Sequence, residues 1–202
     1  MKITAMVAMA VLAGTWARAG EKGQTIEPRV TVCMEAGMAV EALQARAIAR
    51  KMFADINVNL DWHTEHACPA DPEGVIHIKL VTGSDFLPGA LACALPYEGV
   101  HIQVFVDRVR KLVTPRIVPA LLAHVLAHEI THIIQGVSQH SECGVMKARW
   151  DHTDHQEMAW RPLSFTERDV QLIHLGLERR AAHFTQGTQL TADSSQALVA
   201  AQ

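Results

Sequence analysis

A single apolar helix constrains this 202-residue chain more than any other feature of its sequence. Proline favours the first turn of a helix and glycine the position just after its end, so Pro119 and Gly136 bracket a helix over about 118–135. Its sequence, VPALLAHVLAHEITHIIQ, is apolar on most sides, which predicts a buried position. Buried histidine and glutamate are costly without partners, so the HEITH segment must be satisfied by something.

The HEITH segment favours a metal ion as that partner. Residues four apart lie on one helix face, so the ring nitrogens of His128 and His132 can converge on one cation. Zinc suits imidazole ligands and lowers the pKa of a bound water to about 7. Glu129, beside the first ligand, can take the proton of that water. We therefore predict a Zn²⁺ site with Glu129 as the catalytic base, the alternative being histidines satisfied by core hydrogen bonds.

A catalytic zinc site normally has three protein ligands, and the sequence offers several candidates for the third. His140 follows soon after Gly136, which lets the chain turn back toward the helix, and it is our prediction. A longer return loop could instead bring in Glu157, Asp151 or His152. With Glu157 or Asp151 as the third ligand, the protein would be a zinc enzyme of another class.

Two further histidines are not expected to bind the metal. His124 lies one turn before His128 on the same face, and we expect it to make core hydrogen bonds. His155, like His152, is expected in a solvent-exposed loop.

The amino terminus resembles an export signal. Lys2 precedes an apolar stretch that ends in Ala17-Arg18-Ala19, a small-x-small cleavage pattern, so residues 1–19 are predicted to be removed. The mature protein is then expected in the periplasm or outside the cell, off the membrane; an uncleaved anchor is the alternative. The formal net charge is −3 and no basic stripe is present, which argues against nucleic acid as a partner.

Four cysteines lie in the exported part, where disulfides are permitted. Their spacing contains no C-x-x-C, so we expect two structural disulfides. Of the three possible pairings, we favour the one that joins Cys93 to Cys143, because both are expected near the active site.

The rest of the chain predicts one α+β domain over 28–182, after a short segment at 20–27 and before a flexible tail at 183–202. Alternating or apolar runs predict strands over 29–34, 58–62, 75–82 and 99–109. A helix is expected over 38–56, with a stripe of Val40, Leu43, Ala47, Ile48 and Met52. Residues 137–163 are expected to be irregular, and Ser164 or Thr166 caps a last helix.

The segment HEITHIIQGVSQHSECGVMKARW resembles the active site of the metzincin zinc metallopeptidases, and more closely that of small bacterial exported proteins of this type. The resemblance implies that His128, His132 and His140 bind zinc and that Met146 forms the Met-turn. It also implies a mixed twisted sheet with a helix packed on it, the zinc helix, and a minimal carboxy-terminal subdomain with one helix.

This chain departs from the metzincin pattern at two positions. The usual spacing is H-E-x-x-H-x-x-G-x-x-H, whereas the glycine stands one place late at 136 and the third histidine two places late at 140. The family also binds extended peptides along an edge strand, which would be GVHIQVFVDRV here, unless that segment is a plain sheet strand. Tyr97 and the loop 87–99 would border the cleft.

These observations together predict an exported, monomeric zinc endopeptidase that acts on peptides or proteins. The alternatives are the other zinc enzyme class described above, a metal- or partner-binding protein without activity, and a structural zinc fold without substrate access.

Overall fold

The computed structural model describes residues 28–35, 40–69, 74–94 and 100–199, and their side chains as far as residue 183. The predicted signal peptide, the segment 20–27 and Tyr97 lie outside these ranges. The strands are β1 (Arg29–Met34), β2 (Asn59–Thr64), β3 (Ile76–Val81), β4 (Ala92–Ala94) and β5 (His101–Phe105). The helices are α1 (Val40–Ala54), α2 (Val106–Leu112), α3 (Val118–Gln135), α4 (His152–Met158) and α5 (Glu167–Val199), with a 3-10 turn at Glu65–Ala67.

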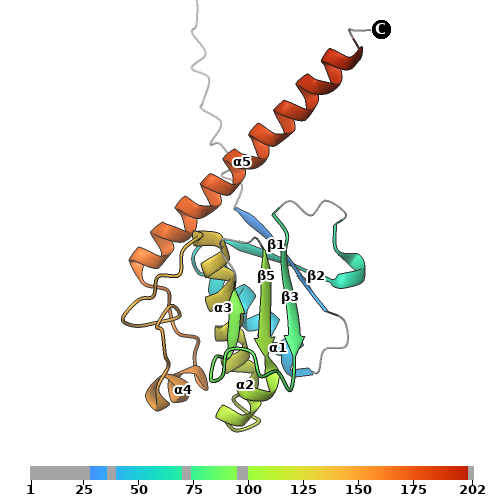
Figure 1. Ribbon diagram of the computed structural model, residues 1–202. Helices are drawn as coiled ribbons and strands as arrows, with labels where there is room; N and C mark the ends of the chain where they lie inside the picture. The colour runs from blue at the N-terminus through green and yellow to red at the C-terminus, as the bar shows by residue number, and fades with distance from the viewer. Residues whose placement is uncertain (1–27, 36–39, 70–73, 95–99, 200–202) are drawn as a thin grey trace, which may run out of the picture.

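The strands form one mixed sheet in the order β2-β1-β3-β5-β4. The first four strands in this order run parallel, and β4 runs antiparallel to β5. Helices α1 and α3 lie together against the sheet (Figure 1). Alternation along β1 puts Val30, Val32 and Met34 into the core between them. The prediction of an α+β fold with a mixed sheet and a packed helix is confirmed.

The predicted strand 99–109 is wrong over its second half. The strand ends at Phe105, and α2 begins at Val106. Val106 and Val109 are both buried, and this three-residue spacing suits a helix rather than a strand. Asp107 in the first turn and Arg110 in the last also match the helix dipole.

One edge of the sheet is formed by β2 and the other by β4, which lies in a stretch predicted as a loop. Because β4 pairs with β5, the segment we proposed as an edge strand is internal. Within the described residues, the unpaired edge next to β5 therefore belongs to Ala92–Ala94.

Helix α1 is confirmed, but the face that it buries differs from the predicted stripe. Val40 is 68% exposed and Leu43 is 54% exposed. The buried face is formed by Ala42, Ala45, Ala49, Met52 and Phe53. Small alanine side chains let α1 approach α3 closely, so packing distance outweighs the burial of single large side chains here.

The predicted helix 118–135 is confirmed as α3, and Gly136 ends it with a left-handed φ of 66°. Gly176 of α5 packs against this helix: a Cβ there would lie 2.2 Å from the carbonyl oxygen of Ile134. Thr166 caps α5, since its hydroxyl accepts the Asp169 backbone N–H. The helix continues to Val199, past the predicted start of the tail, and no proline interrupts it (Figure 1).

The favoured disulfide pairing is wrong. The structure joins Cys33 to Cys68, whose Cα atoms lie 5.8 Å apart, and leaves Cys93 and Cys143 as free thiols. Cys33 pairs in register with His63 of β2, and the 3-10 turn that follows β2 brings Cys68 back over the sheet. One disulfide is thus present where two were expected.

Among the described helices, none combines the length and apolar composition needed to cross a membrane.

Candidate metal centre

Backbone carbonyls fix the protonation of the two helix histidines. Nδ1 of His128 lies 2.9 Å from the carbonyl oxygen of Val145, and Nδ1 of His132 lies 2.9 Å from that of Val137. A carbonyl can only accept a hydrogen bond, so each Nδ1 carries the proton and donates it. In a neutral ring the Nε2 atom is then a bare acceptor.

These two bare acceptors face one another. The Nε2 atoms of His128 and His132 are 3.0 Å apart, and both rings are buried. Burial lowers the pKa of His128 to about 4 and lowers that of His132, so both rings are neutral at pH 7. Two nitrogens that bind one tetrahedral zinc would be separated by roughly 3.3 Å. A shared cation could satisfy both lone pairs.

His140 completes the cluster. Its ring centroid lies 5.2 Å from that of His128 and 5.0 Å from that of His132. One nitrogen from each of the three rings lies within 4.8 Å of the other two. The left-handed turn at Gly136 reverses the chain, which allows His140 to return to the exposed side of the pair. The three predicted ligands are therefore brought together, and they could hold a metal ion.

The segment after His140 is anchored from two sides. The backbone N–H of Ser141 donates to the carbonyl oxygen of Met146 at 2.8 Å, and Met146 is fully buried. Gly144 has a φ of 75°, and a Cβ there would lie 2.2 Å from the carbonyl oxygen of Ser164. Only glycine fits this position.

A buried carboxylate holds the residue next to His140. Asp169, in the first turn of α5, is 4% exposed. It accepts a hydrogen bond of 2.6 Å from the Ser141 hydroxyl and two more from Thr166. The last helix thus fixes the loop that carries His140.

We expect Ser141→Ala and Asp169→Ala each to weaken zinc binding about tenfold, because residues that orient a metal ligand typically affect affinity on this scale. Both variants break the same hydrogen bond, so the double variant should be no weaker than the more severe single one. Zinc affinity is measured by competition with a chelator of known affinity. Ser164→Ala removes an exposed hydroxyl outside this bond and serves as the control. Additive losses would show that the two side chains act separately.

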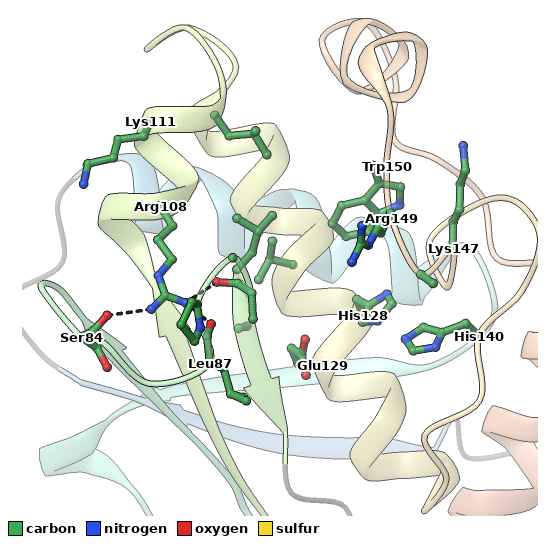
Figure 2. A pocket seen from close by; sticks show the side chains of 18 of the residues that line it. Ser84, Leu87, Arg108, Lys111, His128, Glu129, His140, Lys147, Arg149 and Trp150 are labelled. Carbon is green, nitrogen blue, oxygen red and sulfur yellow. Dashed lines mark hydrogen bonds between the residues drawn. The ribbon is translucent and has the colours of Figure 1, made fainter.

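Glu129 of α3 is hydrogen-bonded through its carboxylate to the backbone of the edge strand β4. Burial raises the pKa of Glu129 to about 7, and a hydrogen bond with the Ala94 backbone opposes that rise. Its carboxylate lines the same cleft as His128 and His140 (Figure 2). The group is therefore placed beside the candidate metal ligands, and a carboxylate with this pKa can exchange a proton near neutral pH.

His124 makes core hydrogen bonds, as expected. Its Nδ1 donates to the carbonyl oxygen of Ala120 at 2.7 Å, and its Nε2 accepts the Leu163 backbone N–H at 2.9 Å. The ring is fully buried and ties the end of the segment 140–163 to α3. Burial lowers its pKa to about 4.

His124 is expected to make the protein less stable in mild acid. Its pKa is about 4 in the folded chain and near 6.5 in the unfolded chain, so only the unfolded chain takes up this proton as the pH falls from 6.5 to 4. Stability is complete above this window and falls across it by about 3 kcal/mol. In His124→Gln, which cannot titrate, the loss of urea stability between pH 7 and pH 5 should be smaller. His66→Gln, at an exposed site, should behave as the wild type.

The carboxylates considered as alternative third ligands make other contacts in the structure. Asp151 caps α4, where it accepts the backbone N–H groups of Thr153 and Asp154, and it also accepts from Lys147. Glu157 accepts a hydrogen bond of 3.0 Å from Arg161. The structure does not bring these carboxylates into the histidine cluster.

His152 and His155 lie on α4, in a stretch that the sequence predicts as a loop. His152 is exposed there, as expected. His155 is half-buried and lines the cleft, which the sequence did not indicate.

A cleft of about 1150 Å³ opens onto the metal centre. One wall is formed by residues 84–92 and α2, the floor by α3, and the other wall by residues 147–155 (Figure 2). This volume exceeds that of a typical small-molecule pocket, so the cleft suits an extended ligand. The loop 87–99 was predicted to border it, and residues 87–92 do so.

A single guanidinium holds the first wall together. Arg108 of α2 stacks on Phe105, with its central carbon 4.0 Å from the ring centroid. Its terminal nitrogens donate at 2.6–2.8 Å to the carbonyl oxygens of Ser84, Phe86, Leu87 and Ala90. Because the planar guanidinium of Arg108 makes four hydrogen bonds to this wall, the wall is held in place before any ligand binds.

Sequence reasoning missed Asp169, Arg108 and Trp150 as contributors to the site. The spacing of Thr166 and Asp169 is that of a capping box, which could have drawn attention to the carboxylate. Arg108 contacts carbonyls 18 to 24 residues away, so no local pattern marks it. Trp150 donates to the Gly144 carbonyl at 3.2 Å, and its ring centroid lies 5.6 Å from that of His128.

Comparison with known proteins gives no further assignment: no family model matches the chain, and no curated protein matches its sequence.

Proposed function

We propose that this protein is an exported zinc-dependent endopeptidase of the metzincin type. The observation that carries the proposal is the pair of bare Nε2 atoms, 3.0 Å apart and buried, beside His140 and Glu129 in an open cleft. The order of the helix, the glycine turn, the third histidine and the buried Met146 supports the metzincin assignment. The predicted signal peptide supports export.

In this proposal the residues of the site have the following roles. His128, His132 and His140 hold zinc, which when bound polarises the scissile carbonyl and lowers the pKa of water. Glu129 accepts the proton of the attacking water and returns it to the leaving amine. Its raised pKa suits both transfers near pH 7.

The edge strand β4 supports recognition of an extended peptide. Its outer edge is unpaired within the described residues, and Ala94 contacts Glu129. A peptide that pairs with Ala92–Ala94 would therefore pass beside the catalytic carboxylate. The preformed wall held by Arg108 would reduce the cost of ordering this surface on binding.

Metal analysis followed by cleavage of an unbiased peptide library tests the proposal. We expect one zinc ion per chain, cleavage of internal peptide bonds, loss of cleavage on chelation and recovery when zinc is restored. A chain that binds zinc but cleaves no peptide would contradict the proposal and favour a metal- or partner-binding protein.

A further inference from the structure

The charges that line the cleft do not follow the composition of the chain. The whole sequence has 18 lysines and arginines against 21 aspartates and glutamates. Among the described residues that line the cleft, the cations are Arg108, Lys111, Lys147 and Arg149, whereas the carboxylates are Asp85 and Glu129. Cations therefore outnumber carboxylates in the cleft at the candidate metal centre, although the whole chain is slightly acidic.

Three of these four cations already have partners. Lys111 pairs with Asp107 at 3.7 Å on the same helix. Lys147 pairs with Asp151 at 2.9 Å and also with Asp154. Arg108 uses its guanidinium to hold four backbone carbonyls.

Arg149 differs from the other three. It is exposed, and no carboxylate of the described residues lies within ion-pair distance of it. Figure 2 shows its side chain near that of Trp150, on the cleft wall formed by residues 147–155. Trp150 is fixed by its hydrogen bond to Gly144, so Arg149 extends from an anchored segment. Its five N–H donors are therefore available to a ligand beside the metal.

The opposite wall is of different chemistry. Leu87 and Leu112 are 44% and 51% exposed, and with Leu91 they line the cleft on the wall formed by residues 84–92 and α2. A bound peptide would thus meet apolar side chains on one side of the metal and a free guanidinium on the other.

We infer that Arg149 is a specificity-determining residue that binds a carboxylate of the peptide on the His140 side of the scissile bond. This inference rests on the proposed function. A guanidinium recognises either an acidic side chain or the carboxylate at the end of a peptide by the same paired hydrogen bonds. The two sources are separated by the substrates used in the test.

Matched peptides provide the test. From cleaved library members, we compare versions with Glu or Gln at each position on either side of the scissile bond, each with a free or an amidated carboxyl terminus. We expect kcat/KM to be about tenfold higher for the version that carries the carboxylate, as for a charge-assisted hydrogen bond in a partly open site. Dependence on Glu identifies a side chain, and dependence on the free terminus identifies the terminal carboxylate.

Variants of Arg149 show whether this side chain is the cause. In Arg149→Gln the preference should fall to about onefold, because the peptide that carries the carboxylate loses its advantage over its neutral counterpart. In Arg149→Glu the preference should reverse toward Lys peptides. Lys111→Gln, which removes a paired cation from the other wall, should leave the preference within about twofold of the wild type. A preference that persists in Arg149→Gln, or is absent from the wild type, would overturn the inference.

A binding measurement separates this inference from the proposed function. The zinc-loaded Glu129→Gln variant is titrated with the same fluorescent peptides, so that affinity is read without turnover. Cleavage of neutral peptides without any carboxylate preference would remove the inference and leave the peptidase. Carboxylate-dependent binding through Arg149, with no cleavage by the wild type, would remove the peptidase and leave the binding site.

Discussion

Replacing Glu129 by Gln is expected to lower kcat for peptide hydrolysis by about 10²- to 10⁴-fold, the range for loss of a catalytic proton transfer. The glutamine has nearly the same shape, and its carbonyl oxygen can still accept a hydrogen bond from the Ala94 backbone. The three histidines are unchanged, so zinc content should remain at one ion per chain. Turnover is measured on a library-derived peptide and zinc by elemental analysis of the same sample.

The comparison of turnover with zinc content is the decisive part of this experiment. Glu142→Gln, in the loop after His140, removes an exposed carboxylate of the same kind and should keep wild-type turnover. If Glu129→Gln also kept turnover with full zinc content, another group would be the base or the protein would have another function.

Replacing His140 by Ala is expected to weaken zinc binding about 100-fold or more. Binding of structural zinc by four ligands contributes about 10–16 kcal/mol, so one ligand accounts for roughly 3 kcal/mol. His140 is exposed, and its removal leaves no cavity in the core, so the urea stability of the metal-free protein should change little. Zinc affinity is again measured by competition with a chelator.

A matched variant and the alternative ligands complete the His140 test. His152→Ala removes an exposed histidine from α4, outside the cluster, and should bind zinc as the wild type does. Unchanged affinity in His140→Ala would show that another residue, such as Asp151 or Glu157, is the third ligand, against their pairing with Lys147 and Arg161 in the structure.

Local patterns predicted much of the fold correctly. The helix 118–135 and the strand 29–34 have the predicted bounds, because burial of a clear periodic pattern leaves few alternatives. The strand predicted at 99–109 extended too far because Val104 and Val106 continue its alternation into a segment that forms α2. The exposed Val40 and Leu43 show that hydrophobicity alone does not identify the packed face of a helix.

The candidate site, like the fold, was predictable from local sequence patterns only in part. The sequence by itself determined the pair of helix histidines and the adjacent carboxylate, since residues one and four apart on a helix have fixed relative positions. It also indicated His140, through the glycine that ends the helix.

Only the tertiary structure decided the rest: which carbonyls orient the imidazoles, that Asp169 secures the loop, and that the edge strand is β4. It likewise decided that Cys33 pairs with Cys68. The physical reason is that the contacts of His128, Ser141 and Cys33 join residues 17 to 35 positions apart, and their meeting depends on how the whole core packs rather than on any local preference of the chain.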